Sequence, residues 1–223
     1  MEKANKKQVN EMTVQRIKAI IKKMIKPTDR TEKYWKKAAS KDVESVMESI
    51  CDHFDKKTFD TKKEALIFSQ NIKFDKNMKI LDLACGMGRT CKWVAPHVNE
   101  YVGVDFIPEM IRKAKEYNNR FKNAKFVVND GKSLNVLDSD YFDLAYSELA
   151  FQHMLKPIQE SYVREILRVL KKGGLFYVQI PRIEYYNDKT YSRTKKETDE
   201  LFQKFLVTYE NTSDAYYYIK AEK

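Results

Sequence analysis

The feature of this sequence that most constrains its fold is a regular alternation of short apolar runs and amphipathic stretches after residue 77. Five runs have the length and composition of β-strands: residues 79–84, 100–104, 125–128, 142–146 and 175–180. Helical patterns are predicted at residues 89–95, 108–118, 159–170 and 195–205, the third of them ended by Gly173-Gly174 and a turn. Strands separated by helices favour right-handed crossovers and a parallel sheet covered on both faces. Residues 206–210 and 215–221 flank a turn-forming stretch and predict a hairpin at the end.

Residues 1–76 lack this alternation and have patterns typical of helices. Apolar positions recur at helical spacing over residues 9–26, where Pro27 ends the pattern. Shorter helices are predicted at 32–39, at 43–51 and after an N-cap at Thr61. We therefore expect an α-helical N-terminal cap over residues 1–76 and a separate α/β domain over residues 77–223.

The chain is basic, with 42 Lys and Arg against 32 Asp and Glu and a formal net charge of +10. Residues 1–40 hold 12 of these basic residues and 4 of the acidic ones, so most of the excess lies in the N-terminal cap. Such a segment is either the solvated face of an amphipathic helix or an arm that contacts an acidic macromolecule.

Composition excludes several classes of protein. A hydrophobic content of 43% and an aromatic content of 13% are too high for a disordered chain. No apolar run approaches the roughly 20 residues that a membrane span needs, and the first ten residues are polar and Lys-rich. The three cysteines have neither CxxC spacing nor a nearby His pair. We expect a cytoplasmic protein in its reduced form, with no membrane span and no metal.

The strongest candidate site begins where the first predicted strand ends. The sequence Gly86-Met87-Gly88 follows that strand at once and leads into a helix, so backbone N–H groups can approach a ligand there. Asp105 ends the second predicted strand, where a carboxylate can accept hydrogen bonds from both hydroxyls of a ribose. Asp130 follows the third strand, near the place of an adenine amino group. The pattern predicts an adenosine-type ligand.

A nicotinamide dinucleotide is disfavoured as that ligand. Its fingerprint has a third glycine where this sequence has Cys91, and the loop shows no Arg that would clamp a pyrophosphate. Asp82, inside the strand just before the loop, is also unusual for such a site. A carboxylate at that position is better placed to orient an ammonium group or backbone amides.

With these motifs, the sequence resembles the class I S-adenosylmethionine-dependent methyltransferases. Residues 81–89 resemble the first motif of that family, 103–111 the second, 129–131 the third, 142–153 the fourth, and 165–176 the helix-turn-strand that follows. The resemblance implies S-adenosylmethionine as cofactor. It also implies an α/β fold with a Rossmann-like, seven-stranded, mostly parallel sheet whose last strand is antiparallel, together with the α-helical N-terminal cap.

The resemblance also implies which residues contact the cofactor. Gly86 and Gly88 pass its methionine part along the backbone, Asp82 organises the ammonium group, Asp105 holds the ribose and Asp130 meets the adenine. Arg89 either meets the cofactor carboxylate or is exposed in the first turn of its helix. The remaining expected contacts are with Ala84, Cys85, Phe106, Ile107, Met110, Gly131 and Ser147. Tyr34 and Trp35 either fold over the cofactor as a lid or pack the N-terminal helices against the domain.

Methyl transfer from a sulfonium depends mainly on alignment, because the methyl group is already activated. Proximity and orientation supply roughly 7–11 kcal/mol, whereas a general base supplies about 10²–10⁴-fold. The candidates for a base are His153 and, less favoured, Glu148, both after the fourth strand. His153 is equally well explained as a structural histidine.

The acceptor site is expected on the segments after the fourth and fifth strands. The candidates are Tyr146, His153, Tyr185, Tyr186 and Tyr191, although tyrosines after the fifth strand are more often only the surface of a long loop. Residues 146–149, Tyr-Ser-Glu-Leu, do not match the Asn/Asp-Pro-Pro-Tyr/Phe motif of enzymes that methylate base amino groups. Nucleic-acid bases are therefore disfavoured as acceptors.

These observations predict transfer of a methyl group to an oxygen or nitrogen of a small-molecule acceptor. One alternative is an RNA or protein methyltransferase that uses the basic N-terminal arm. Another is a regulatory subunit that binds the cofactor without turnover, and a nicotinamide oxidoreductase is the least favoured. The sequence carries no signal of an oligomeric state.

Overall fold

The structure is a computed structural model that describes residues 33, 35–37, 39–40, 72–186, 189, 191–209 and 216–223. The chain divides into two units, residues 1–37 and 38–223, and each is described by itself. Residues 33, 35–37 and 39 are helical, in agreement with the helix predicted at 32–39. The helices predicted at 9–26, at 43–51 and after Thr61 lie outside the described residues.

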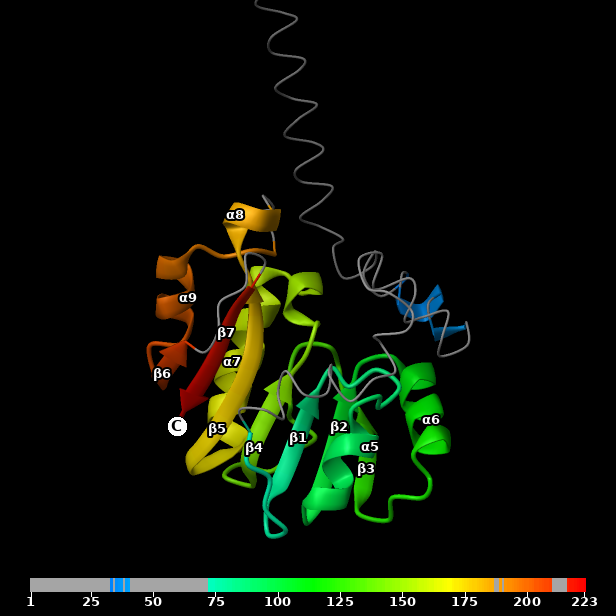
Figure 1. Cartoon of the computed structure of the whole chain (residues 1–223). Helices are drawn as coiled ribbons and strands as arrows, with labels where there is room; N and C mark the ends of the chain where they lie inside the picture. The colour runs from blue at the N-terminus through cyan, green and yellow to red at the C-terminus, as the bar shows by residue number, and fades with distance from the viewer. Residues whose placement is uncertain are drawn as a thin grey trace, which may run out of the picture. The chain divides into compact units, whose positions relative to one another are not determined.

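Seven strands form one sheet in the order β3-β2-β1-β4-β5-β7-β6 (Figure 1). The strands are β1 (Lys79–Leu83), β2 (Glu100–Asp105), β3 (Ala124–Val128), β4 (Phe142–Ser147), β5 (Leu170–Pro181), β6 (Leu206–Tyr209) and β7 (Tyr216–Glu222). The pairs among β1 to β5 are parallel, and β7 is antiparallel to both of its neighbours. The predicted parallel sheet with an antiparallel last strand is therefore confirmed. The antiparallel pairing of β6 with β7 agrees with the predicted hairpin.

Helices follow β1, β2, β4 and β5, and none lies between β3 and β4, where every residue is described. The helices are α5 (Cys91–Val94), α6 (Pro108–Tyr117), α7 (Lys156–Val169), α8 (Ile183–Tyr186) and α9 (Lys195–Leu201), with short 3₁₀ turns η1 (Ala95–His97) and η2 (Phe151–His153). Proline in the first turn of α6 suits a position whose N–H has no partner within the helix. A capping box between Thr194 and Glu197 begins α9.

Two apolar clusters pack on opposite faces of the sheet because side chains alternate along each strand. Leu81 and Leu83 of β1 pack with α7 and α9 in one cluster. Ile80, from the same strand, packs with α5 and α6 in the other. In Figure 1, α7 lies behind β4 and β5, and α5 lies in front of β2. The sheet is thus covered on both faces, as the sequence predicts.

The boundaries of β5 differ from the expectation. The strand begins at Leu170 instead of Leu175, and its register with β4 shifts between Phe142 and Leu144. Gly173, with φ +75°, lies inside this irregular part, and its N–H donates to the C=O of Lys223 at 2.9 Å. The two glycines therefore lie within a strand that pairs with the chain's last residues, whereas α7 has already ended at Val169.

Candidate functional site

The carboxyl ends of β1, β2 and β4 meet where the chain changes direction in the sheet. From β1, the chain builds β2 and β3 on one side and β4 and β5 on the other. In open α/β sheets, ligands bind at such a point, outside the carboxyl ends of the strands, and we call this region the crevice. Residues 84–90, which we call the glycine loop, form one wall of this region.

Two glycines of the loop face different surroundings. Gly86 and Gly88 have φ angles of +53° and +69°, a region that side chains disfavour. A Cβ added to Gly88 would lie 2.7 Å from Asn118 Nδ2 and from Phe126 Cε1, so the protein itself fills that space. A Cβ added to Gly86 would meet no atom within 4 Å. The backbone at Gly86 thus faces open space.

Asp105 links the end of β2 to the glycine loop. Its Oδ2 accepts a hydrogen bond from the N–H of Gly86 at 3.0 Å, and its Oδ1 accepts one from the N–H of Ile107 at 2.9 Å. The residue is only 8% exposed. Burial raises the pKa of Asp105 to about 6, because desolvation disfavours the charged carboxylate.

Asp82 belongs to a buried cluster of hydroxyl groups beneath the loop. Its Oδ2 accepts hydrogen bonds from Thr90 Oγ1 at 2.7 Å and from the Tyr101 hydroxyl. The Tyr146 hydroxyl lies 2.7 Å from Thr90 Oγ1. Burial raises the pKa of Asp82, although the hydroxyl hydrogen bonds oppose that rise. The predicted role of Asp82 toward an ammonium group stays a prediction.

The segment after β3 brings Gly131 against Phe106. An added Cβ on Gly131 would lie 3.3 Å from the Phe106 side chain, so only the bare backbone fits at this distance from the ring. Asp130 is exposed and accepts hydrogen bonds from the N–H groups of Lys132 and Ser133. Partial burial raises the pKa of Asp130, but these bonds outweigh it and leave the pKa below its usual value. The adenine roles of these residues stay predictions.

An ion pair joins the loops that follow β1 and β4. Arg89 Nη2 lies 3.0 Å from Glu148 Oε2, and the Glu148 side chain is only 6% exposed. Ser147, the last residue of β4, donates from Oγ to the C=O of Leu83 at 2.9 Å. These two contacts hold the ends of β1 and β4 together. They also give Arg89 and Glu148 a role toward each other that the sequence did not predict.

His153 ends the 3₁₀ turn η2 that follows β4. Burial lowers its pKa to about 4, since desolvation disfavours the imidazolium ion. The imidazole is therefore neutral at neutral pH and has a nitrogen that can accept a proton. Whether that proton comes from an acceptor molecule stays a prediction.

Other predicted residues differ in their exposure. Cys85, Ile107 and Met110 are buried and Ala84 is half-buried. Among the expected acceptor residues, the Tyr146 hydroxyl lies in the Asp82 cluster and Tyr185 is 55% exposed on α8. Tyr191 is half-buried, and its C=O accepts a hydrogen bond from Gln159 Nε2 at 2.7 Å. Of Tyr186, only the backbone on α8 is described. Tyr34 lies outside the described residues, and Trp35 belongs to the N-terminal unit.

A buried pair, Gln159 and Arg193, was not predicted. Gln159 Nε2 donates to the C=O groups of Phe151, Met154 and Tyr191, and its Oε1 accepts from Arg193 Nε at 2.7 Å. One amide side chain thus joins the turn that holds His153 to the segment after β5. The only sequence signal is a polar residue at an inward position of an amphipathic helix.

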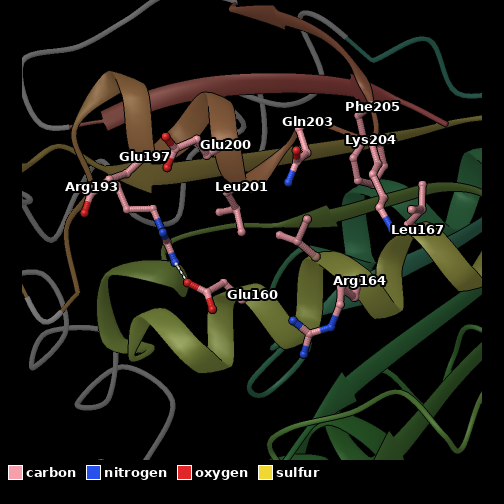
Figure 2. A pocket seen from close by; sticks show the side chains of 11 residues that line it. Glu160, Arg164, Leu167, Arg193, Glu197, Glu200, Leu201, Gln203, Lys204 and Phe205 are labelled. Atoms are coloured by element: carbon pink, nitrogen blue, oxygen red, sulfur yellow. Dashed lines mark hydrogen bonds and ion pairs between the residues drawn. The ribbon is translucent and has the colours of Figure 1, made fainter.

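A hollow of about 400 Å³ lies between α7 and α9 (Figure 2). Its lining includes Leu167 and Leu201, with charged residues around them, and Arg193 pairs with Glu160 at 3.0 Å across one end. None of the glycine loop or the ends of β1 and β2 lines it. It is a feature separate from the crevice.

Within the described part of the chain, no group of three or more His, Cys, Asp or Glu side chains could hold a metal ion. No helix among the described residues is both long and apolar enough to cross a membrane.

Comparison with known proteins identifies a family that this sequence matches. The sequence profile of the methyltransferase-domain family matches residues 74–223. The 2-methyl-6-phytyl-1,4-hydroquinone methyltransferase of Synechocystis is 33% identical over 100 residues, which are 44% of this chain and 30% of that protein. Phosphoethanolamine N-methyltransferase 3 of Arabidopsis thaliana is 27% identical over 147 residues, which are 65% of this chain and 29% of that protein. The chain thus spans about three tenths of these relatives.

A solved structure shares the fold. Phosphoethanolamine N-methyltransferase 1 of Haemonchus contortus, in complex with phosphoethanolamine and S-adenosylhomocysteine, superposes with a TM-score of 0.68 and 16% sequence identity. The superposition covers 88% of this chain and 49% of that one. At this identity, the likeness concerns the fold alone.

Proposed function

This chain belongs to the methyltransferase-domain family, and we propose on that premise that it transfers a methyl group from S-adenosylmethionine to an oxygen or nitrogen of a small-molecule acceptor. The observation that carries this proposal is the pairing of Asp105 with the glycine loop, through the N–H of Gly86 at 3.0 Å. This contact brings a buried carboxylate and a bare stretch of backbone together at the carboxyl edge of the sheet. Both features suit an adenosine-type ligand.

The residues in this crevice fit S-adenosylmethionine. Open space at Gly86 leaves room for a ligand beside the backbone. Asp105 offers carboxylate oxygens for the ribose hydroxyls, and the contact between Phe106 and Gly131 offers a flat apolar surface for adenine. When bound, the cofactor supplies a methyl group on a positively charged sulfur, which a nucleophilic acceptor atom displaces in line.

The chain's own contribution is mainly to orient the two reactants and to exclude water. Alignment supplies roughly 7–11 kcal/mol. A general base adds less, about 10²–10⁴-fold, and His153 with a pKa of about 4 is a weak base at neutral pH. Glu148 is held in an ion pair by Arg89, so its carboxylate already has a partner within the protein. We therefore assign His153 to the acceptor side of the crevice, with positioning as its larger contribution.

The small-molecule acceptor is supported by the names of the relatives, which act on a hydroquinone and on phosphoethanolamine. We assign the acceptor to Tyr185, Tyr186 and Tyr191 and to the helices predicted from the sequence within residues 1–76.

The other parts of the proposal concern the organisation of the chain. We place the boundary between the N-terminal cap and the catalytic domain between residues 76 and 77, and we assign the protein to the cytoplasm. We assign Tyr34 and Trp35 to a lid over the cofactor.

The test follows the methyl group. The wild-type chain is incubated with S-adenosylmethionine labelled on the methyl group and with a cell extract, which is then divided into small-molecule, RNA and protein fractions. We expect label in the small-molecule fraction, and none with the variant Asp105→Ala. Label in RNA or protein would overturn the acceptor class and favour the role of the basic N-terminal arm.

Calorimetry with S-adenosylhomocysteine and with NAD tests the cofactor separately. We expect S-adenosylhomocysteine to bind and NAD to bind more weakly. Tighter binding of NAD would overturn the cofactor assignment. Binding of S-adenosylhomocysteine without label in any fraction would favour a regulatory subunit over an enzyme.

A further inference from the structure

The glycine loop is held at three points by side chains from other elements. At its start, Asp105 accepts the N–H of Gly86. In its middle, Asn118 Nδ2 donates to the C=O of Gly88 at 3.1 Å. At its end, Thr90 donates from Oγ1 to Asp82 Oδ2 at 2.7 Å. The shape of the loop is therefore fixed by the protein's own contacts.

The third point is buried and depends on Tyr101. Asp82 and Thr90 are 4% and 7% exposed, and Tyr101 is fully buried. Tyr101 donates from its hydroxyl to Asp82 Oδ2, the same oxygen that Thr90 contacts. The register of the sheet explains the contact, since Asp82 and Tyr101 lie on the neighbouring strands β1 and β2 and point to the same face. A buried carboxylate without such donors would carry a large desolvation penalty.

We propose that Tyr101 is a positioning residue of the cofactor site, which fixes Asp82 and through Thr90 sets the shape of the glycine loop that S-adenosylmethionine binds. Tyr101 is fully buried, and its ring packs against Phe126 with centroids 5.7 Å apart. Its influence passes through the hydrogen bonds that Tyr101 and Thr90 donate to Asp82, and through the contact of 3.4 Å between the Tyr101 hydroxyl and Thr90 Oγ1. The inference rests on the proposed function.

The charged and titratable groups around Asp82 define how the cluster responds to pH. Facing or near it are Arg89, Tyr101, Tyr146, Cys85, Cys91 and Asp105. Burial raises the pKa of Asp82, and the hydroxyl of Tyr101 opposes this rise most strongly among its hydrogen-bond donors. Removing that hydroxyl raises the pKa further, so Asp82 becomes protonated at a higher pH.

The variant Tyr101→Phe tests the proposal against a matched control, Tyr141→Phe. Tyr141 also donates to a carboxylate, Glu100 Oε2 at 2.6 Å, but at the opposite, amino-terminal edge of the sheet. We expect Tyr101→Phe to weaken binding of S-adenosylhomocysteine about tenfold, the effect of one hydrogen bond to a charged group. The loss should grow as the pH is lowered and Asp82 becomes protonated, because the pKa of Asp82 is raised by burial. Tyr141→Phe should match the wild type at every pH.

A second pair covers the case in which Tyr101→Phe folds poorly. Thr90→Val removes the hydroxyl and keeps the shape, whereas Thr90→Ser keeps the hydroxyl. We expect Thr90→Val to bind S-adenosylhomocysteine more weakly than the wild type, and Thr90→Ser to bind it about as tightly as the wild type. Wild-type affinity in both Tyr101→Phe and Thr90→Val, with an unchanged pH profile, would overturn the proposal.

Amide hydrogen exchange of residues 84–90 gives a readout that needs no cofactor. We expect faster exchange in Tyr101→Phe than in Tyr141→Phe, and exchange equal to the wild type would overturn the proposed hold on the loop. A wild-type chain that binds no S-adenosylhomocysteine would overturn the proposed function instead. Hydrogen exchange in the variants therefore tests the role of Tyr101, and binding by the wild type tests the proposed function.

Discussion

Asp105 Oδ2 and the backbone N–H of Gly86 lie 3.0 Å apart, so the carboxylate expected to hold a ribose also holds the loop beside it. The same side chain accepts the N–H of Ile107 through its other oxygen. Both oxygens thus have one backbone donor and keep a lone pair for a ligand hydroxyl. The contact links the two halves of the proposed cofactor site through one residue.

Asp105→Ala is therefore expected to weaken binding of S-adenosylhomocysteine by about 100-fold or more, since hydrogen bonds to a charged group contribute about 1.5–3 kcal/mol each. Asp105→Glu keeps the charge and is expected to retain part of the affinity. The exposed carboxylate Asp138, in the segment before β4, provides a matched control in Asp138→Ala, which should bind as the wild type does. Calorimetry gives the three affinities, and equal values for Asp105→Ala and Asp138→Ala would contradict the ribose role.

The two glycines of the loop should respond differently to the same substitution. Gly88→Ala forces a Cβ to 2.7 Å from both Asn118 and Phe126, and overpacking costs about 1–3 kcal/mol in addition to about 1–2 kcal/mol for the left-handed backbone. Gly86→Ala has only the backbone cost, because its Cβ meets no atom within 4 Å.

Denaturant unfolding and calorimetry separate the two effects. Gly88→Ala should lose roughly 2–5 kcal/mol of unfolding free energy. Gly86→Ala should lose about half of that and yet bind S-adenosylhomocysteine more weakly, since its methyl group enters the space left for the ligand. If Gly86→Ala binds as tightly as the wild type, the ligand does not pass along that stretch of backbone.

The sheet and the position of the crevice could be predicted from local patterns. Strand runs such as residues 79–84 and 100–104 carry their own signal, and a parallel order brings their carboxyl ends together. The Gly173-Gly174 pair shows a limit of this reasoning. It was expected to end a helix and form a turn, but both glycines lie inside β5 and form backbone hydrogen bonds with Lys223. No local pattern contains that distant partner.

The side-chain pairs of the site could not be predicted for the same reason. Arg89 and Glu148 are 59 residues apart in the sequence, and Gln159 and Arg193 are 34 apart. Their meeting depends on the register of neighbouring strands and on the path of each crossover. The sequence does show polar residues at inward positions, Asp82 on β1 and Gln159 on α7. It does not show which groups satisfy them.

Gln159 should affect the acceptor side of the crevice without affecting the cofactor side. Gln159→Leu removes the donor for three C=O groups and the acceptor for Arg193 Nε, and buried polar groups left without partners cost about 1–3 kcal/mol each. We expect lower stability and faster amide exchange at residues 151–154 and 191–193. Binding of S-adenosylhomocysteine should change little.

The matched control is Gln203→Leu, the same substitution at an exposed position after α9. It should leave both stability and exchange unchanged. Faster exchange over the glycine loop in Gln159→Leu would contradict the separation, because it would show that the pair supports the whole crevice.

Asp105 and His153 should give the stability of the fold opposite dependences on pH. The pKa of Asp105 rises from its usual 3.8 to about 6, so the folded state binds more protons between these values and this group makes the fold less stable as pH rises through them. The pKa of His153 falls from its usual 6.5 to about 4. The unfolded state then binds more protons, and this group makes the fold less stable as pH falls from 6.5 to 4. Over its pH window, each of the two groups changes the free energy of unfolding by about 3 kcal/mol, since one pKa unit corresponds to about 1.36 kcal/mol.

Because the two windows overlap, the two contributions should largely cancel in the wild type between about pH 4 and about pH 6. Denaturant unfolding of single variants should separate them. His153→Gln should expose the Asp105 contribution, with stability that falls as pH rises. Asp105→Asn should expose the His153 contribution, with stability that falls as pH is lowered. Parallel stability curves for the wild type and both variants would contradict the burial of these two groups, whereas opposite changes in slope would establish that each is neutralised by its surroundings.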